Sequence, residues 1–333
     1  MALTTSTSTG ISQRTNVYAE RQMLMHAGPT TVLDKFGVAK RMPKNKSETV
    51  KFRRPKVFDA VLTPMVEGVT PNTTAFEYED VSADLKQYGM VVGITDVIED
   101  THEDPVLQDV TQQAGENIGR TVEALTYAVL KGGSNVFYAN GTGRGDVNTA
   151  ISLNKQRAVT RALKAQKGMK ITRMLSGSPD YETRAIEASY VAVAHTDVEA
   201  DIRGLSGFVP TAEYGQRQVL CPEEIGAVED VRYILSADLD PILGVGSSTI
   251  NGMVSQGASK VDIYPVLYFA KEAYGTVALR GQGAVSPSII PVNQRTKDDP
   301  LGQRGFVGWK TWFVAVRLNE AWMARLEVGV TAL

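Results

Sequence analysis

A single long amphipathic helix restricts how this chain can fold more than any other feature. Between residues 104 and 131, apolar residues recur at steps of three or four and form one stripe: Leu107, Val110, Ala114, Ile118, Val122, Leu125 and Val129. Asp104 and Pro105 suit its first turn, and Gly132-Gly133 suits its end. Such a helix is about 40 Å long, which is about twice the usual globular length or more. We expect it to act as a structural spine.

Two opposed blocks of charge precede the helix. Residues 35–56 hold nine Lys or Arg against Glu48, a net charge of +8, and residues 77–104 hold nine Asp or Glu against Lys86, a net charge of −8. The whole chain carries only −2. This pattern favours a protein that meets copies of itself, because one basic block can attract another copy's acidic block. The candidate interface residues are Lys51, Arg53, Arg54, Lys56, Glu77, Glu79, Asp80 and Asp84.

A long hairpin is predicted between the N-terminus and the helix. Its strands are the apolar runs Val50–Leu62 and Tyr88–Ile98, and its tip is the turn-rich segment Glu67–Thr74. A lone hairpin is only marginally stable in water, so we expect this one to pack against another part of the molecule or against another copy. Some of the charge attraction is also expected across its own strands. Before it, residues 1–16 are rich in Ser and Thr and predict a flexible tail.

The region after the spine helix mixes helices and strands. A second amphipathic helix is expected between Ser152 and Gly168, followed by short helices among strands. The stretch Phe306–Val330 carries all three tryptophans and alternates as a long strand does, with a break near Asn319. Shorter strands are expected at Tyr190–Ala194, Val231–Leu235 and Val261–Tyr264. The chain is therefore predicted to be of the α+β class.

Composition excludes several classes of protein. The single cysteine, Cys221, rules out a disulfide within the chain, and no apolar run is long enough for a membrane helix. No secretory signal is legible at the N-terminus. The three histidines have no partner at metal-ligand spacing, and the acidic block lacks the EF-hand pattern, so we expect no metal or other cofactor.

Catalytic and phosphate-binding motifs are also weak. Cys221 lacks a nucleophile signature and is expected to be a small buried apolar group. The glycine-rich loops near 141–145 and 244–252 have no phosphate-loop spacing, so they are expected to be turns, and the triplet Arg144-Gly145-Asp146 is too short to identify an adhesion site. We expect the chain not to be an enzyme, although a hydrolase using Cys221 stays open as an alternative.

Several short motifs occur in an order that resembles one family. They are Glu67-Gly68-Val69-Thr70-Pro71, Gln87-Tyr88-Gly89, Glu224-Ile225-Gly226, Ala273-Tyr274-Gly275, Asp299-Pro300-Leu301-Gly302-Gln303-Arg304-Gly305 and Trp309-Lys310. Together they resemble the major capsid proteins of the N-four-like tailed phages, with a Hong Kong 97-type fold. The resemblance runs from about residue 17 to the C-terminus.

The resemblance implies a fold, a function and a set of domains. It implies an N-terminal tail and arm, an extended β-hairpin loop, a peripheral domain with the spine helix, a mixed-sheet axial domain and peripheral return strands, at residues 1–48, 49–101, 102–185, 186–285 and 286–333. It implies a virion shell of hexamers and pentamers around weakly held double-stranded DNA, assembled in the host cytoplasm. Portal, scaffold or decoration proteins are implied as further partners, and a membrane is not. A bacterial nanocompartment shell, which shares the fold, stays open as an alternative.

Overall fold

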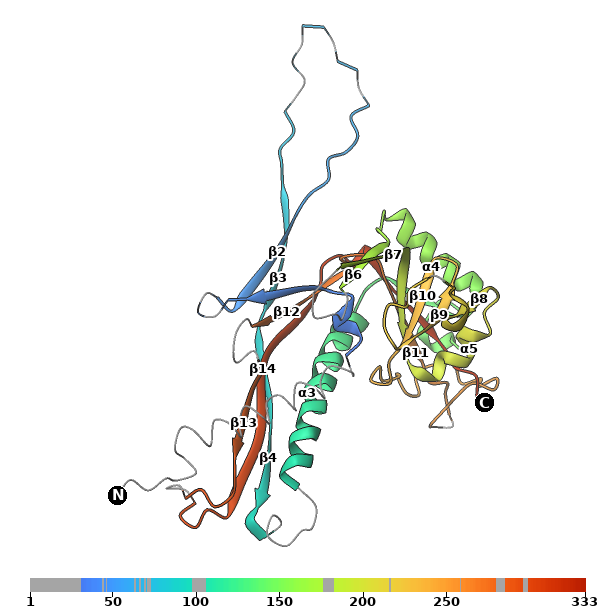
Figure 1. Ribbon diagram of the computed structural model, residues 1–333. Helices are drawn as coiled ribbons and strands as arrows, with labels where there is room; N and C mark the ends of the chain where they lie inside the picture. The colour runs from blue at the N-terminus through green and yellow to red at the C-terminus, as the bar shows by residue number, and fades with distance from the viewer. Residues whose placement is uncertain are drawn as a thin grey trace.

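A computed structural model shows a projecting hairpin, a long sheet backed by a helix, and a separate mixed-sheet domain to one side (Figure 1). It describes residues 31–333 except 44, 46, 63, 66, 69, 71–72, 98–105, 176–182, 216, 258, 280–284 and 296–298. The predicted tail and the residues predicted to begin the spine helix, Asp104 and Pro105, lie outside the described residues. Within the described part, no helix is long and apolar enough to cross a membrane.

The first sheet has five strands and carries the spine helix. Its strands are β1 (Val38–Met42), β12 (Tyr274–Leu279), β14 (Arg304–Arg317), β13 (Val285–Ile290) and β4 (Lys86–Thr95). β14 is the centre, because β4 pairs along one of its edges while β12 and β13 share the other. The helix α3 (Val106–Lys131) lies along this sheet (Figure 1). Its Ala114 and Ile118 pack with Ile94, Val307 and Trp309.

The second sheet forms the core of the separate domain. Its strands are β5 (Val136–Tyr138), β15 (Met323–Val328), β11 (Tyr264–Phe269), β7 (Thr183–Ala194), β10 (Val231–Leu235), β9 (Glu224–Val228) and β8 (Phe208–Pro210), and β6 (Ile171–Leu175) pairs with β7. β9, β10, β11 and β15 are buried along their whole length, as expected for strands covered on both faces. The helices of this domain are α4 (Leu153–Ala165) and α5 (Glu199–Arg203). The described chain also forms 3₁₀ turns at Leu33–Lys35, Arg144–Asp146, Thr196–Val198, Thr211–Glu213 and Glu320–Trp322.

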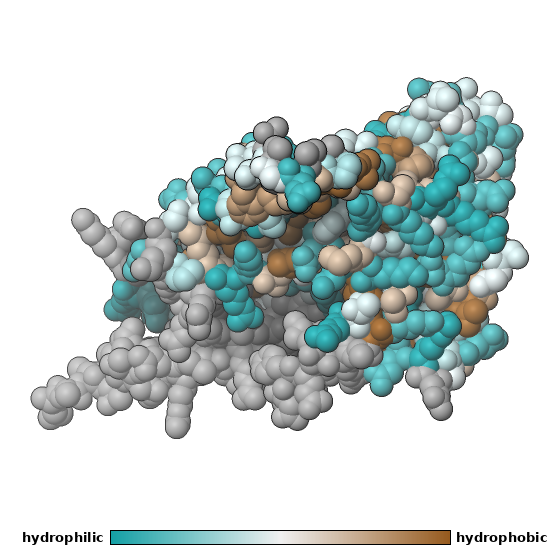
Figure 2. Space-filling view, turned by 90° about the horizontal axis from the view of Figure 1, so that it is seen from above, coloured by the Kyte–Doolittle hydropathy of each residue, from teal (hydrophilic) through white to brown (hydrophobic). Residues whose placement is uncertain are grey.

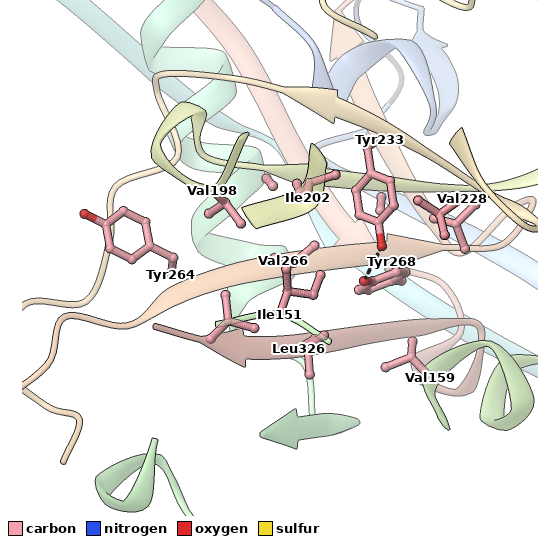
Figure 3. Close-up of a cluster of buried hydrophobic side chains, with 14 of the residues drawn as sticks. Ile151, Val159, Val198, Ile202, Val228, Tyr233, Tyr264, Val266, Tyr268 and Leu326 are labelled. Atoms are coloured by element: carbon pink, nitrogen blue, oxygen red, sulfur yellow. Dashed lines mark hydrogen bonds between the residues drawn. The ribbon is translucent and has the colours of Figure 1, made fainter. Parts of the chain in front are cut away.

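One buried cluster fills the space around this second sheet. Val159 comes from α4, Ile202 from α5, and Val266 and Leu326 from adjacent strands (Figure 3). Tyr233 and Tyr268 are fully buried and share a hydrogen bond of 3.0 Å between their hydroxyls. Their polar atoms are therefore satisfied, which burial in an apolar core requires.

The spine helix joins the two sheets. It ends at Lys131, directly before Gly132-Gly133, as the sequence predicts. Its C-terminal half is buried beyond the predicted stripe, because Tyr127 and Leu130 pack into a cluster with Val191 and Leu267 of the second sheet. The same helix therefore contributes buried side chains to the packing of both sheets.

The hairpin is real, but the prediction of its second strand was wrong. The strand β2 (Thr49–Pro55) pairs with β3 (Tyr78–Asp84), and the apolar run at Tyr88 belongs to β4, which pairs with β14 instead. β3 reads Tyr-Glu-Asp-Val-Ser-Ala-Asp and has little apolar content, so a search for apolar strands passes over it. It faces β2 with acidic residues opposite Arg53 and Arg54, and with Val81 opposite Phe52.

The other predicted elements agree with the structure more closely. The second helix, the strands near 190 and 231, and the long C-terminal strand with its break at Asn319 are confirmed. The strand expected at Val261–Tyr264 begins only at Tyr264, because the preceding residues join their neighbour by one isolated bridge, Ile242 to Ile263.

Candidate assembly surfaces

The root of the hairpin is held by ion pairs between directly opposed residues. Arg53 donates to Asp80 at 2.7 and 3.0 Å, and Arg54 donates to Glu79 at 2.8 Å. Lys56 donates to Glu77 at 3.0 Å, just beyond the last strand residue. At the other end of the strands, Thr49 donates to Asp84 at 2.7 Å. The structure thus brings six of the eight candidate residues together as pairs within one chain.

These pairs are exposed, so they act mainly on register. The hydrogen bond from Arg53 lowers the pKa of Asp80, and the same bond raises the pKa of Arg53. A one-residue slip of β2 would place each cation beside the wrong residue and reverse the faces of the hairpin. Arg41 and Lys51 are exposed and form no ion pair with another described residue, so basic charge remains at the root.

Reversing Arg53 and Arg54 to glutamate is expected to impair assembly far more than folding. The two new carboxylates would oppose Asp80 and Glu79, so the hairpin root would open while both buried cores stayed intact. We expect at least a tenfold rise in the concentration needed for assembly, measured by light scattering. The thermal midpoint of the subunit should move by less than about 3 °C.

A compensating variant separates two roles of these arginines. If they act within the chain, adding Asp80→Arg and Glu79→Arg restores assembly, because opposite charges again face each other across β2 and β3. If assembly stayed impaired although the hairpin had re-formed, the arginines would pair with another copy. Normal assembly by the first variant would show that neither role matters.

Beyond the ion pairs, the hairpin continues as an extended loop with an apolar surface. Its exposed apolar side chains are Val57, Phe58, Val61, Leu62, Met65, Phe76 and Tyr78. Figure 2 looks down on this end of the molecule and shows brown hydrophobic residues where the loop projects. Phe76 contacts both Phe58, with ring centres 6.0 Å apart and the rings tilted, and Tyr78, with ring centres 4.7 Å apart and the rings edge to face. Soluble monomers rarely expose a patch of this kind without using it.

Sequence reasoning missed this surface, although a signal was present. The sequence predicts Val57, Phe58, Val61 and Leu62 as part of one hairpin strand, an edge strand because Pro55 interrupts it. Strand pairing ends at Pro55, so the residues that follow have no sheet to pack against. The absence of alternation after Pro55 is the signal that the strand ends there and leaves these side chains exposed.

The N-terminal arm is anchored on the spine helix by a buried carboxylate. Glu123 has no exposed surface and accepts hydrogen bonds from the backbone N–H groups of Val32, at 3.1 Å, and Leu33, at 3.0 and 3.2 Å. The Tyr274 hydroxyl donates to the carbonyl of Leu33. β1 then continues the arm as the edge strand beside β12. The arm is therefore fixed to the spine at one point.

Docking of the arm is expected to weaken as pH rises from about 5 to 8. Burial raises the pKa of Glu123 from 4.5 to about 7, and the nearby Asp238 and Asp34 add to this against the two backbone N–H donors. Because the folded state binds this proton more tightly than the unfolded state does, its relative stability falls as pH passes from 4.5 through 7. Hydrogen-exchange protection factors of the Val32 and Leu33 amides should fall over this range.

Two variants test the source of that pH dependence. Glu123→Gln keeps one carbonyl acceptor and should give protection that no longer varies with pH. Asp109→Asn, on the exposed first turn of the same helix, should keep the original dependence. Protection that varied equally in all three proteins would assign the effect to another group.

Cys221 and the Arg144-Gly145-Asp146 triplet make contacts within the folded chain. Cys221 is buried, and burial beside Glu223 raises the pKa of its thiol to about 12, so almost no nucleophilic thiolate forms at neutral pH. Arg144 donates two hydrogen bonds to the buried Glu327, at 2.6 and 2.7 Å. Asp146 accepts from the backbone of Thr142 and Gly143. The Arg-Gly-Asp triplet is thus engaged inside the chain, and no group of metal-ligating residues gathers in the described ranges.

Comparison with known proteins shows which family and which solved structures this chain is similar to. Residues 78–326 match the model of a family described as phage capsid protein. The fold is similar to the capsid of Ralstonia phage GP4, with a TM-score of 0.63, 12% identity, and coverage of 91% of this chain and 90% of that one. It is also similar to the cyanophage Pam1 capsid, with a TM-score of 0.60, 15% identity, and coverage of 92% and 93%.

A shell of another kind is also similar. The holo-SrpI encapsulin complex from Synechococcus elongatus PCC 7942 matches with a TM-score of 0.51 and 12% identity, covering 88% of this chain and 86% of that one. A search of curated proteins found no significant match.

Proposed function

The chain belongs to the phage capsid protein family and is a major capsid protein with a Hong Kong 97-type fold, and we propose that it builds the icosahedral head of a tailed double-stranded DNA phage from hexamers and pentamers. Its place is the capsid of the virion, and its main partner is itself.

The observation that carries this proposal is the exposed apolar loop. Val61 and Leu62 are 87% and 91% exposed and belong to none of the four buried clusters of the described residues, so they add little to the stability of a lone subunit. Burying such side chains against a neighbour contributes about 1.5–3 kcal/mol each. Many contacts of this size, repeated by symmetry, close a shell while each one stays reversible.

The parts of the subunit have separate tasks in this proposal. The arm to residue 48 and the loop of 49–101 reach neighbouring copies, as do the candidate interface residues Lys51, Arg53, Arg54, Lys56, Glu77, Glu79, Asp80 and Asp84. The peripheral domain, 102–185 with 286–333, forms the wall, and the axial domain, 186–285, meets other copies around each capsomere axis. Within this division β5, α4 and β15 pack with the axial sheet, and β12 pairs in the peripheral one. A net charge of −2 lets packaged DNA contact the wall weakly. Assembly in the host cytoplasm with portal, scaffold or decoration proteins completes the proposal.

We further propose that the subunit has no catalytic role. Its one cysteine is buried and protonated, which removes the basis for a Cys221 hydrolase. Its family is one of structural shell proteins. A measured activity that Cys221→Ala abolished would overturn this part.

Electron microscopy of the purified protein tests the main proposal. We expect closed shells with hexameric and pentameric capsomeres, and particles from the native source that contain DNA. A chain that stayed monomeric at high concentration and formed no shells in its source would refute it. Particles filled with protein cargo would instead favour the nanocompartment alternative, which the encapsulin likeness keeps open.

A further inference from the structure

One segment of the mixed-sheet domain carries charge of a single sign. Residues 147–175 contain seven Lys or Arg and no Asp or Glu. The rest of the chain carries a net charge of −9, because the whole chain carries −2. The segment includes α4, which packs on the second sheet through Val159 and Leu163 and lies at the outside of the domain (Figure 1). A cluster of cations on an outer helix is the electrostatic feature that binds a polyanion.

The exposed side of α4 presents its cations in one row. Arg157, Arg161 and Lys164 follow one another at steps of four and three, so they lie on the same side of the helix. All three are exposed, and they are about 6 and 4.5 Å apart along the helix axis. Ala158 and Ala165 lie beside them, and their side chains are too small to hold a phosphate backbone away. The row is therefore accessible to a rod-shaped polyanion.

Acidic residues of the same chain neutralise part of this charge. Glu229 pairs with Arg157 at 2.5 Å, and Asp230 pairs with Lys164 at 2.5 Å and with Lys170 at 2.9 Å. Both acids stand in the turn between β9 and β10, at one side of the helix. Two carboxylates thus face three cations.

The other four cations of the segment have no counter-charge within the described chain. Lys155, Arg161, Lys167 and Arg173 form no ion pair with another described residue, and the last three are exposed. Together with the paired residues they leave a local net charge of +5. This surface therefore attracts anions from outside the subunit.

The composition of the surface favours a nucleic acid over another protein. Residues 147–175 contain no Phe, Tyr or Trp, and four of the seven cations are lysines. Protein interfaces are enriched in aromatic residues and depleted in lysine. Without aromatic side chains the surface also cannot stack on bases. Attraction to phosphates remains, and it does not depend on base sequence.

We propose that the basic face of α4 lines the inside of the shell and contacts the phosphate backbone of the packaged double-stranded DNA. This inference rests on the proposed shell function and adds the surface on which the weak DNA contact is made. Because the contact is sequence-independent, each copy can bind whichever part of the genome lies against it. Glu229 and Asp230 compete with DNA for three of the cations, which keeps each contact weak enough to break when the genome leaves.

Cross-linking inside filled particles tests the contact. DNA-filled particles are treated with formaldehyde, which joins lysine amines to the amino groups of nearby bases, and peptides that carry nucleotides are identified by mass spectrometry after nuclease digestion. Lys164 and Lys167 should carry at least tenfold more adduct than Lys260 and Lys310, two lysines that are exposed elsewhere on the subunit. DNA-free shells treated in the same way should give no adduct.

Failure of this inference differs from failure of the proposed function. Filled particles in which the α4 lysines react no more than Lys260 and Lys310 would overturn the assignment of α4 alone. Carbodiimide products that join Lys164 or Lys167 to an acidic residue of another copy would also overturn it, because they assign this face to a subunit interface. If particles from the native source held no DNA, the proposed function would fail first.

The salt dependence of DNA binding gives a second readout. Unassembled subunits should bind a 20-base-pair duplex at low salt, measured by fluorescence anisotropy. Arg161→Gln with Lys167→Gln should weaken this binding at least fivefold and reduce the slope of log K against log salt by about 1.8, since each lost phosphate contact contributes about 0.9.

The matched control is Lys260→Gln with Lys310→Gln, which removes the same two charges from other surfaces and should change the affinity by less than twofold. Equal weakening in both variants would show that net charge alone governs binding. That result, or the absence of binding by the unmodified subunit at low salt, would contradict the proposal.

Discussion

Replacing Val61 and Leu62 with aspartate is expected to abolish shell assembly while the subunit stays folded. Both side chains are almost fully exposed in the single chain, so their loss removes no buried contact and leaves the thermal midpoint unchanged. In a shell they would be buried, and each aspartate would place a charge where an apolar group packs. Sedimentation should show monomers at concentrations at least about a hundredfold above those at which the unmodified chain assembles.

A control in the same loop separates charge from apolar contact. Thr73→Asp with Thr74→Asp adds the same two charges at exposed positions on the returning side of the loop and removes no apolar side chain. We expect this variant to assemble, with a modest rise in the required concentration. Equal loss in both variants would mean that net charge governs assembly, and normal shells from the Val61 and Leu62 variant would remove the loop from the interface.

Glu327→Ala is expected to cost the mixed-sheet domain about 3–5 kcal/mol of its free energy of unfolding. Glu327 has no exposed surface, and it pairs with Arg144 through two hydrogen bonds and with Arg325 at 2.9 Å. Its removal leaves the largely buried Arg325 and the loop cation Arg144 without their counter-charge. The loop carrying Arg144 should also loosen, because this carboxylate anchors it to β15. Urea unfolding of unassembled subunits measures the loss.

The control for this variant is Glu187→Ala in the same sheet. Glu187 is exposed and pairs with Arg217, so its loss should leave the urea midpoint nearly unchanged. A loss equally large at both sites would point to a general effect of removing acidic residues. A negligible loss at Glu327 would show that the two arginines find water or other acceptors.

Local patterns in the sequence predicted the regular elements well. The stripe from Leu107 to Val129 and the glycines at 132 and 133 define α3, and the alternation through Trp312 defines β14. These patterns succeed because periodicity and helix-ending glycines act over a few residues, so they require no knowledge of distant partners. The short motifs in order predicted the capsid family, which the match over residues 78–326 confirms.

Pairing between distant segments was harder to predict. The apolar run at Tyr88 is predicted to be the return strand of the hairpin, but it pairs with β14 instead, along the whole of β4. The polar segment Tyr78–Asp84 is the return strand in the structure, where its acids oppose Arg53 and Arg54 and its Val81 opposes Phe52. Competition among partners depends on all strands at once, which no single window of sequence contains.

The sequence by itself determined the spine, the mixed-sheet domain, the capsid resemblance and the presence of two opposed charge blocks, since each depends on residue type and spacing along the chain. Only the tertiary structure decided which of these charged residues become neighbours. Folding places three cations of the first block opposite three anions of the second in one hairpin, which leaves Arg41 and Lys51 without an ion-pair partner among the described residues. The physical reason is that electrostatic energy depends on distance in space. Opposite charges that are about 25 residues apart in sequence become neighbours once β2 and β3 pair.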